Sequence, residues 1–189
     1  MRELVYYIAT SIDGFIAAPD GDFSFFPNHP DSVTALFNRH PETCPVHLRE
    51  YFGITSGPVR FDAVIMGAHT HQPAINAGLT SAYPHLQQYV VTRRTFPTDE
   101  TVEFVHGDIQ EFMQELKAQE GADIWLCGGS DLGGQLVDEI DEIQVKISPV
   151  VVGSGKPLFG MEFSLSNWSL VSHELLPADV LLATYRRSA

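Results

Sequence analysis

Two adjacent glycines, Gly128 and Gly129, follow a short apolar run and precede the hydroxyl group of Ser130. A strand that ends in two glycines lets a ligand approach the backbone closely, because neither residue carries a Cβ atom. The helix expected after them, Asp131–Val137, adds unpaired N–H groups and the positive end of its dipole, which suit a phosphate. A Gly-Gly pair can also be only a turn, so this pattern needs support from elsewhere in the chain.

Two further predicted strand ends carry glycine, hydroxyl or basic side chains. These residues are Gly67, His69 and Thr70 after one strand, and Thr92, Arg93 and Arg94 at the end of another. Since the carboxyl ends of parallel strands meet at one edge of a sheet, three such ends favour a dinucleotide site there. The two arginines can also be an ordinary solvated strand end.

Two acidic residues near the N-terminus are candidate catalytic groups, because a carboxylate near the reacting atom can supply a proton. Asp13 lies in a Ser-Ile-Asp-Gly segment directly after the first predicted strand, and Asp31 lies farther along the same loop. Both also have structural interpretations. Asp13 can hold the turn at Gly14, and Asp31 can cap a helix that runs to about Arg39.

The loop between these two aspartates is rich in phenylalanine. Phe23, Phe25 and Phe26 can stack on a flat heterocycle, since aromatic faces bind planar rings well. They can equally belong to the core or to a subunit contact. A lid over a substrate and a packing role therefore both stay open for this loop.

The composition excludes several classes of protein. The chain has 189 residues, 44% of them hydrophobic, which fits one globular domain over residues 1–189. Its 11 basic and 24 acidic residues give a formal charge of −13, which argues against nucleic-acid or membrane binding. No segment resembles a signal peptide, so we expect a cytoplasmic protein in which Cys44 and Cys127 are free thiols. His69 and His71 have no third ligand nearby, so no metal is expected.

The elements that must position these residues alternate in the first two thirds of the chain. We predict strands at Glu3–Thr10, Ala63–Met66, Tyr89–Thr92, Val102–Val105 and Asp123–Leu126. We predict helices at Asp31–Arg39, at Val46–Phe52, from Thr70, at Asp108–Glu120 and at Asp131–Val137. Asp108 is expected to cap its helix with Glu111 completing a capping box, and Gly121 is expected to end it.

The last third changes character. Glu142–Val152, Phe163–Glu174 and Val180–Arg187 read as long strands with no helix between them. The order favours an α/β fold of three layers, a mostly parallel sheet with antiparallel C-terminal strands at one edge. Apolar rows at Val150–Val152 and Leu181–Leu182 need cover, so we also predict a homodimer.

The chain resembles the dihydrofolate reductase fold, and more closely the reductase domain of bifunctional riboflavin-biosynthesis proteins and their stand-alone relatives. The matching segments are Ala9–Ala17, Met66–Thr70, Val91–Arg93, Cys127–Ser130, Leu136–Ile140 and Ser148–Phe159. The resemblance covers most of the chain except roughly residues 20–60. Each motif is modest, but five in the same order, counting Leu136–Ile140 and Ser148–Phe159 as one, make it fairly specific.

The resemblance implies transfer of a hydride from NADPH to a small nitrogen heterocycle or an imine-like sugar adduct, as in 5-amino-6-(5-phosphoribosylamino)uracil reductase. By this resemblance, the backbone around Ala9 and Ile16 holds the nicotinamide carboxamide, and Gly67, His69 and Thr70 contact phosphates of the coenzyme. Thr92 and Arg93 border its adenosine ribose. Gly128, Gly129 and Ser130 surround its pyrophosphate. An unusual cis peptide is implied at the glycine pair.

One departure from the family pattern concerns the coenzyme. The family often has arginine directly after the glycine of the Met-Gly motif, whereas this chain has Ala68. Arg93, Arg94 or a charged His69 can take over the 2′-phosphate, or the enzyme accepts NADH instead. Two other functions stay open: reduction of a pterin, nitro or keto compound, and a nucleotide-binding module without turnover.

Overall fold

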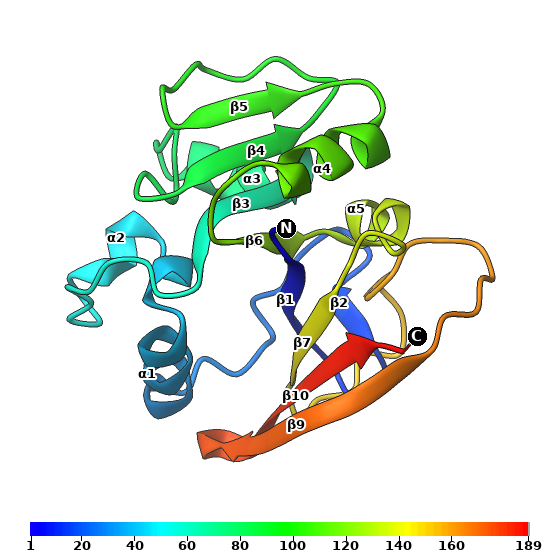
Figure 1. Ribbon diagram of the computed structural model, residues 1–189. Helices are drawn as coiled ribbons and strands as arrows, with labels where there is room; N and C mark the ends of the chain where they lie inside the picture. The colour runs from blue at the N-terminus through cyan, green and yellow to red at the C-terminus, as the bar shows by residue number, and fades with distance from the viewer. Residues whose placement is uncertain (189) are drawn as a thin grey trace.

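The computed structural model, described here for residues 1–188, is built around a sheet of eight strands (Figure 1). The strands are β1 (Leu4–Thr10), β3 (Phe61–Gly67), β4 (Gln87–Val91), β5 (Val102–Val105), β6 (Asp123–Gly128), β7 (Glu142–Ile147), β9 (Trp168–Leu176) and β10 (Val180–Arg187). A separate two-stranded sheet pairs β2 (Phe15–Ala17) with β8 (Lys156–Pro157). The helices are α1 (Pro30–Arg39), α2 (Val46–Arg49), α3 (Ala68–Asn76), α4 (Ile109–Ala118) and α5 (Ser130–Gln135), with short 3₁₀ turns at Pro41–Thr43 and Pro177–Asp179.

The strand order of the large sheet is β5-β4-β3-β6-β1-β7-β10-β9. The pairs from β5 through β7 are parallel, and β10 pairs antiparallel with both β7 and β9. The mostly parallel sheet with antiparallel C-terminal strands is therefore confirmed. Its consequence for function is that β1, β3, β4 and β6 end at the same edge.

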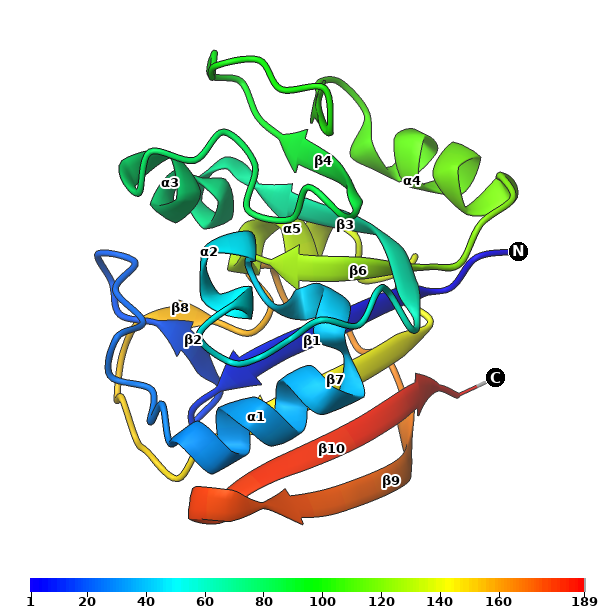
Figure 2. The ribbon, with the colours of Figure 1, turned by 90° about the vertical axis from the view of Figure 1, so that its left-hand side faces the viewer.

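Each face of the sheet is covered by its own apolar cluster. On one face Tyr6 and Ile8 of β1 pack with residues of α4 and α5, among them Met113 and Leu132. On the other face Val5, Tyr7 and Trp125 form a second cluster, against which Leu36 of α1 packs. Figure 2 shows α1 lying across this second face, in front of β1 and β7. Strand β1 is buried on both faces, as expected for the centre of a parallel sheet.

The N-terminus of α4 confirms its predicted cap. The Asp108 carboxylate accepts hydrogen bonds from the backbone N–H groups of Gln110 and Glu111. The end of the helix differs from the prediction, since Gln119 is its C-cap in extended conformation. Gly121 has another reason to be glycine, because a Cβ there would lie 2.7 Å from the Asp62 carboxylate.

Several predicted boundaries are wrong, and those of α1 and β7 have a local cause. Asp31 does not cap α1: His29 is the N-cap residue, and Pro30 occupies the first helical turn, where its missing N–H costs nothing. Strand β7 ends at Ile147 instead of Val152, because Pro149 has no N–H group with which to continue the ladder. Strand β9 begins only at Trp168, and α2 ends at Arg49.

A buried carboxylate connects the segment after α1 to the large sheet. Glu42 is fully buried and accepts hydrogen bonds from the backbone N–H groups of Val59, Arg60 and Phe61, with donor–acceptor distances of 2.9–3.2 Å. This contact fixes the start of β3 relative to the 3₁₀ turn at Pro41–Thr43. The Glu42 carboxylate is therefore one of the contacts that hold the part of the chain without a family resemblance to the core.

None of the helices in residues 1–188 has the length and the apolar character needed to cross a membrane.

We predict that Asp108→Ala lowers the free energy of unfolding by about 1 kcal/mol, because two N–H groups of α4 lose their acceptor. Urea denaturation followed by circular dichroism measures this. Glu115→Ala, which removes an exposed carboxylate from the same helix, serves as the matched control and should change stability by less than about 0.5 kcal/mol. Equal effects of both variants would show that the cap contributes nothing specific.

Candidate functional site

Three predicted strand ends meet at one edge of the sheet. Strand β6 lies between β3 and β1, and β4 lies on the other side of β3. Gly67 ends β3, Gly128 ends β6 and Thr92 directly follows β4. The glycine, hydroxyl and basic residues singled out in the sequence are therefore neighbours in the fold.

The glycines at this edge provide a surface of bare backbone. The peptide bond between Gly128 and Gly129 is cis, as the resemblance implies. Gly128 has a φ of 132°, and a Cβ on it would lie 3.3 Å from Cδ1 of Ile8. A Cβ on Gly129 would lie 3.5 Å from the Thr70 hydroxyl oxygen. The positive φ and the contact with Ile8 disfavour a side chain at Gly128, so backbone peptide groups form this part of the edge.

One hydroxyl group at this edge is unsatisfied. Ser130 is buried at the start of α5, and its Oγ atom has no hydrogen-bond partner among the described residues. A buried hydroxyl without a partner costs free energy, which a bound acceptor recovers. Together with the glycine cradle, this orphaned donor fits the oxygens of a pyrophosphate.

Basic side chains gather beside the end of β4. Nη2 of Arg94 lies 2.6 Å from Nε2 of His69, which is in the first turn of α3. The Thr92 hydroxyl accepts a 2.8 Å hydrogen bond from the backbone N–H of Arg94 and so shapes the turn. Arg93 is exposed next to it. In a chain of formal charge −13, this cluster is a local positive site suited to an isolated phosphate.

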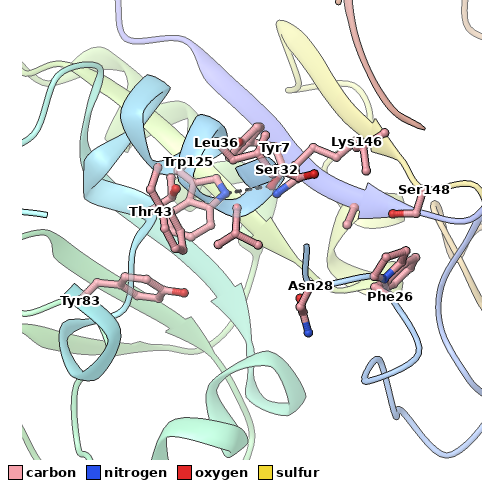
Figure 3. Close-up of a pocket in the computed structure, with 15 residues that line it drawn as sticks. Tyr7, Phe26, Asn28, Ser32, Leu36, Thr43, Tyr83, Trp125, Lys146 and Ser148 are labelled. Atoms are coloured by element: carbon pink, nitrogen blue, oxygen red, sulfur yellow. Dashed lines mark hydrogen bonds between the residues drawn. The ribbon is translucent and has the colours of Figure 1, made fainter. Parts of the chain in front are cut away.

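A cavity of about 280 Å³ opens beside β1 on the face covered by α1 (Figure 3). Tyr7 and Ala9 of β1, Trp125 of β6 and Lys146 of β7 contribute to its walls. The Trp125 indole N–H donates a 3.0 Å hydrogen bond to the Tyr7 carbonyl, which fixes the ring against β1. The walls are mostly apolar, as is typical of small-molecule sites.

The two residues predicted to hold a nicotinamide carboxamide are connected through the end of β1. Ala9 lines the cavity, and Ile16 lies in β2, packed against the first core cluster. The Ser11 N–H donates a 2.9 Å hydrogen bond to the Phe15 carbonyl, which ties β2 to β1. The residue predicted to contact the nicotinamide, Ala9, is therefore also part of the cavity wall.

Asp13 is engaged by a neighbouring loop. Its carboxylate accepts hydrogen bonds from the Ser11 hydroxyl at 2.6 Å and from the backbone N–H groups of Gly153 and Val152 at 2.7 and 3.1 Å. The Ser11 hydrogen bond, followed by that from Gly153, lowers the pKa of Asp13 to about 2. The carboxylate is thus ionised at neutral pH and joins the turn after β1 to the loop after β7.

Asp31 lies away from the cavity walls. Its side chain is 76% exposed in the first turn of α1, 3.9 Å from Nδ1 of His29. The next residue, Ser32, does line the cavity and donates a hydrogen bond to the Pro177 carbonyl. The aspartate and the cavity wall are therefore adjacent in sequence but separate in space.

The phenylalanine loop divides between two hollows. Phe26 lines the first cavity, whereas Phe23 lines a second one of about 470 Å³. The second hollow shares Asn28, Val33 and Phe37 with the first, and its other lining residues also lie between positions 23 and 52. The two hollows together form one recess along α1.

The cavity residues Lys146, Tyr7 and Trp125 were not among the predicted site residues, because all three lie within predicted strands. For Lys146 a signal existed. It is a charged side chain near the end of a largely buried strand, Glu142–Ile147, and lysine is seldom buried without a partner.

The chain has relatives of known sequence and of known structure. It is 31% identical over 163 residues to the uncharacterized protein YwjB of Bacillus subtilis (strain 168), covering 84% of this chain and 83% of that protein. The diaminohydroxyphosphoribosylaminopyrimidine deaminase/5-amino-6-(5-phosphoribosylamino)uracil reductase of Thermotoga maritima has a similar fold. Its TM-score is 0.66 at 17% identity, over 99% of this chain and 57% of that one.

Dihydrofolate reductase from Enterococcus faecalis, complexed with NADP(H) and RAB-propyl, also shares the fold, with a TM-score of 0.64 at 15% identity over 99% of this chain and 97% of that one. The family model of the RibD C-terminal domain matches residues 2–182. The strand order and the glycine pair at the end of β6 agree with this match, and the chain belongs to the RibD C-terminal domain family.

Proposed function

We propose that this protein is a reductase that transfers a hydride from NADPH to a small, flat substrate bound in the cavity beside Ala9. The observation that carries the proposal is the adjacency of two features. The glycine edge fits a dinucleotide, and Ala9, predicted to contact its nicotinamide, is also a wall of the cavity. Hydride donor and acceptor can therefore lie against each other.

The proposed coenzyme supplies the hydride, and the residues of this chain hold and align it. In this arrangement Gly128, Gly129 and Ser130 bind the pyrophosphate. Gly67 and Thr70 approach it from the start of α3. Arg93, Arg94 and His69 receive the 2′-phosphate in the absence of an arginine at position 68, and this favours NADPH over NADH.

A ribosylamino-pyrimidine is our leading substrate class. The solved reductase of Thermotoga maritima, named for 5-amino-6-(5-phosphoribosylamino)uracil, supports it by its similar fold. A pterin or another small molecule is the alternative within enzymes. A nucleotide-binding module without turnover is the alternative outside them. The cytoplasmic location remains a prediction from the sequence.

The proton that completes the reduction has no assigned donor. Asp13 and Asp31 were predicted for this role and remain predictions. The Asp13 carboxylate is already held by three hydrogen bonds, and Asp31 does not line the cavity. We therefore propose that Asp13 acts mainly by positioning the loop at Val152 and Gly153.

A homodimer formed through β9 is our proposal for the quaternary structure. Strand β9 lies at the end of the described sheet and pairs there with β10. It exposes apolar side chains, with Leu170 and Val171 each 53% exposed and Leu175 68% exposed. Leu182, by contrast, is covered within the chain itself. An exposed apolar edge strand favours association with a second copy.

NADPH binding should quench the fluorescence of Trp125 or receive energy from it, because this indole lies three residues before the glycine pair. Titration of the Trp168→Phe variant isolates the signal, since the chain has two tryptophans. Binding followed by NADPH oxidation with an aminopyrimidine or pterin supports the reductase. If NADPH binds but none of these compounds oxidises it, the result supports the nucleotide-binding module without turnover. If no coenzyme binds at millimolar concentration, both enzyme hypotheses are contradicted.

Arg93→Ala is expected to weaken NADPH binding about tenfold, equivalent to about 1.4 kcal/mol, while NADH binding changes little. The reason is that only NADPH carries the phosphate proposed to contact this guanidinium. Competition titrations of the two coenzymes measure the ratio. Arg186→Ala removes the same charge at the opposite edge of the sheet and should leave the ratio unchanged. An unchanged ratio in Arg93→Ala would refute the phosphate assignment.

Light scattering should report a particle of twice the chain mass of 20.9 kDa. Val171→Glu, which places a charge in the proposed apolar interface, should shift the protein to monomer at micromolar concentration. Ala118→Glu adds the same charge at an exposed position of α4, outside β9, and is the matched control. A monomeric wild-type protein would disprove the dimer.

A further inference from the structure

Lys146 brings a positive charge into a cavity that holds no carboxylate. Among the described residues that line this cavity, none is aspartate or glutamate, and Lys146 carries the one charge expected at neutral pH. Figure 3 shows the side chain extending from β7 over the ring of Tyr7. The surrounding walls, such as Val33 and Leu36 of α1, are apolar.

The ammonium group has only a weak partner within the chain. Its Nζ atom lies 3.8 Å from the centre of the Tyr7 ring, a cation–π contact. No ion pair to it exists among residues 1–188, although other basic side chains, such as Arg60 and Lys117, have carboxylate partners. Such a charge is costly to bury unless a counter-ion is added. A ligand with an anionic oxygen supplies one.

The titratable side chains around Lys146 do not provide that counter-ion. They are Tyr7 on β1, Tyr83 before β4 and Cys127 on β6. Burial raises the pKa of the Cys127 thiol to about 12 and raises the pKa values of both tyrosines above their usual range. All three are neutral at pH 7. The residue of β10 opposite Lys146 is Leu182.

The position of Lys146 relative to the coenzyme edge is fixed by the sheet. It is the register partner of Ala9 in the parallel pairing of β1 with β7, and neighbouring strands lie about 4.8 Å apart. Ser148 lies two residues farther along the chain and also lines the cavity. An ammonium and a hydroxyl group are therefore available directly beside the residue predicted to contact the nicotinamide.

We propose that Lys146 makes this cavity select flat substrates that present an anionic oxygen, such as a carboxylate or a deprotonated ring oxygen. The term substrate rests on the proposed reductase function, whereas the anion selectivity rests on the cavity alone. A flat anion gains the ammonium and the apolar walls of Tyr7 and Trp125. A cationic ring, such as a protonated aminopteridine, meets a like charge where water does not screen it.

The test uses two flat probes of similar size and opposite charge, benzoate and benzamidine, titrated into the full chain by calorimetry without coenzyme. Benzoate is expected to bind at least about tenfold more tightly than benzamidine at pH 7. Lys146→Met should remove at least about tenfold of the benzoate affinity, and Lys146→Arg should retain most of it. Lys156→Met, a substitution of an exposed lysine outside the cavity, is the matched control.

A pH series adds a signature of the charge itself. Burial lowers the pKa of Lys146 to about 8, so the side chain is mostly protonated at pH 7 and mostly neutral above pH 9. Benzoate affinity should therefore fall as pH rises through about 8, and this dependence should vanish in Lys146→Met. Circular dichroism of each variant verifies the fold.

Equal binding of both probes, no binding of benzoate at millimolar concentration, or wild-type affinity in Lys146→Met would overturn the inference. Its failure is distinguishable from failure of the reductase proposal. NADPH binding with no charge preference in the cavity refutes only the role of Lys146. Lysine-dependent benzoate binding without NADPH binding refutes only the reductase.

Discussion

The candidate site depends on glycine residues, which have no side chains, at the carboxyl ends of β3 and β6. A residue with a side chain at position 128 would have to adopt a φ of 132°, and its Cβ would contact Ile8. A Cβ at position 129 would contact the Thr70 hydroxyl. Because these positions are glycine, peptide groups rather than side chains face the ligand side of the edge. Our assignment of the other groups depends on this exposed backbone. They are the buried Ser130 hydroxyl, the basic cluster after β4 and the cavity at Ala9.

Charge is distributed along the strands in a way that supports this arrangement. At the amino ends of the central strands, Arg60 contacts Asp123 and Glu142, and Arg186 contacts Glu3 and Glu142. These acidic residues thus form ion pairs at the end of the strands opposite to the candidate site. At the carboxyl ends, Arg93, Arg94 and His69 lie beside the end of β4. A strongly acidic chain can therefore still offer a local environment that favours phosphates.

The sheet and the meeting of its glycine-bearing strand ends could be predicted from sequence because their signals are local. Apolar runs such as those of β3 and β6 identify buried strands, and a glycine pair after a strand identifies a close backbone approach. The cavity could not be predicted in the same way. Its walls come from α1, β1, β6 and β7, which only the folded sheet brings together. Glu42, which holds residues 40–60 to β3, forms contacts across 17 to 19 positions and leaves no periodic pattern.

The position of β10 between β7 and β9 has a consequence for synthesis on the ribosome. The chain emerges in the order β7, β9, β10, yet β9 joins the described sheet only through β10. During translation the backbone N–H and C=O groups of β9 therefore stay unpaired until β10 has left the exit tunnel. A nascent chain stalled between these two strands would expose a ready template for aggregation, which makes this interval the one where a chaperone is most useful.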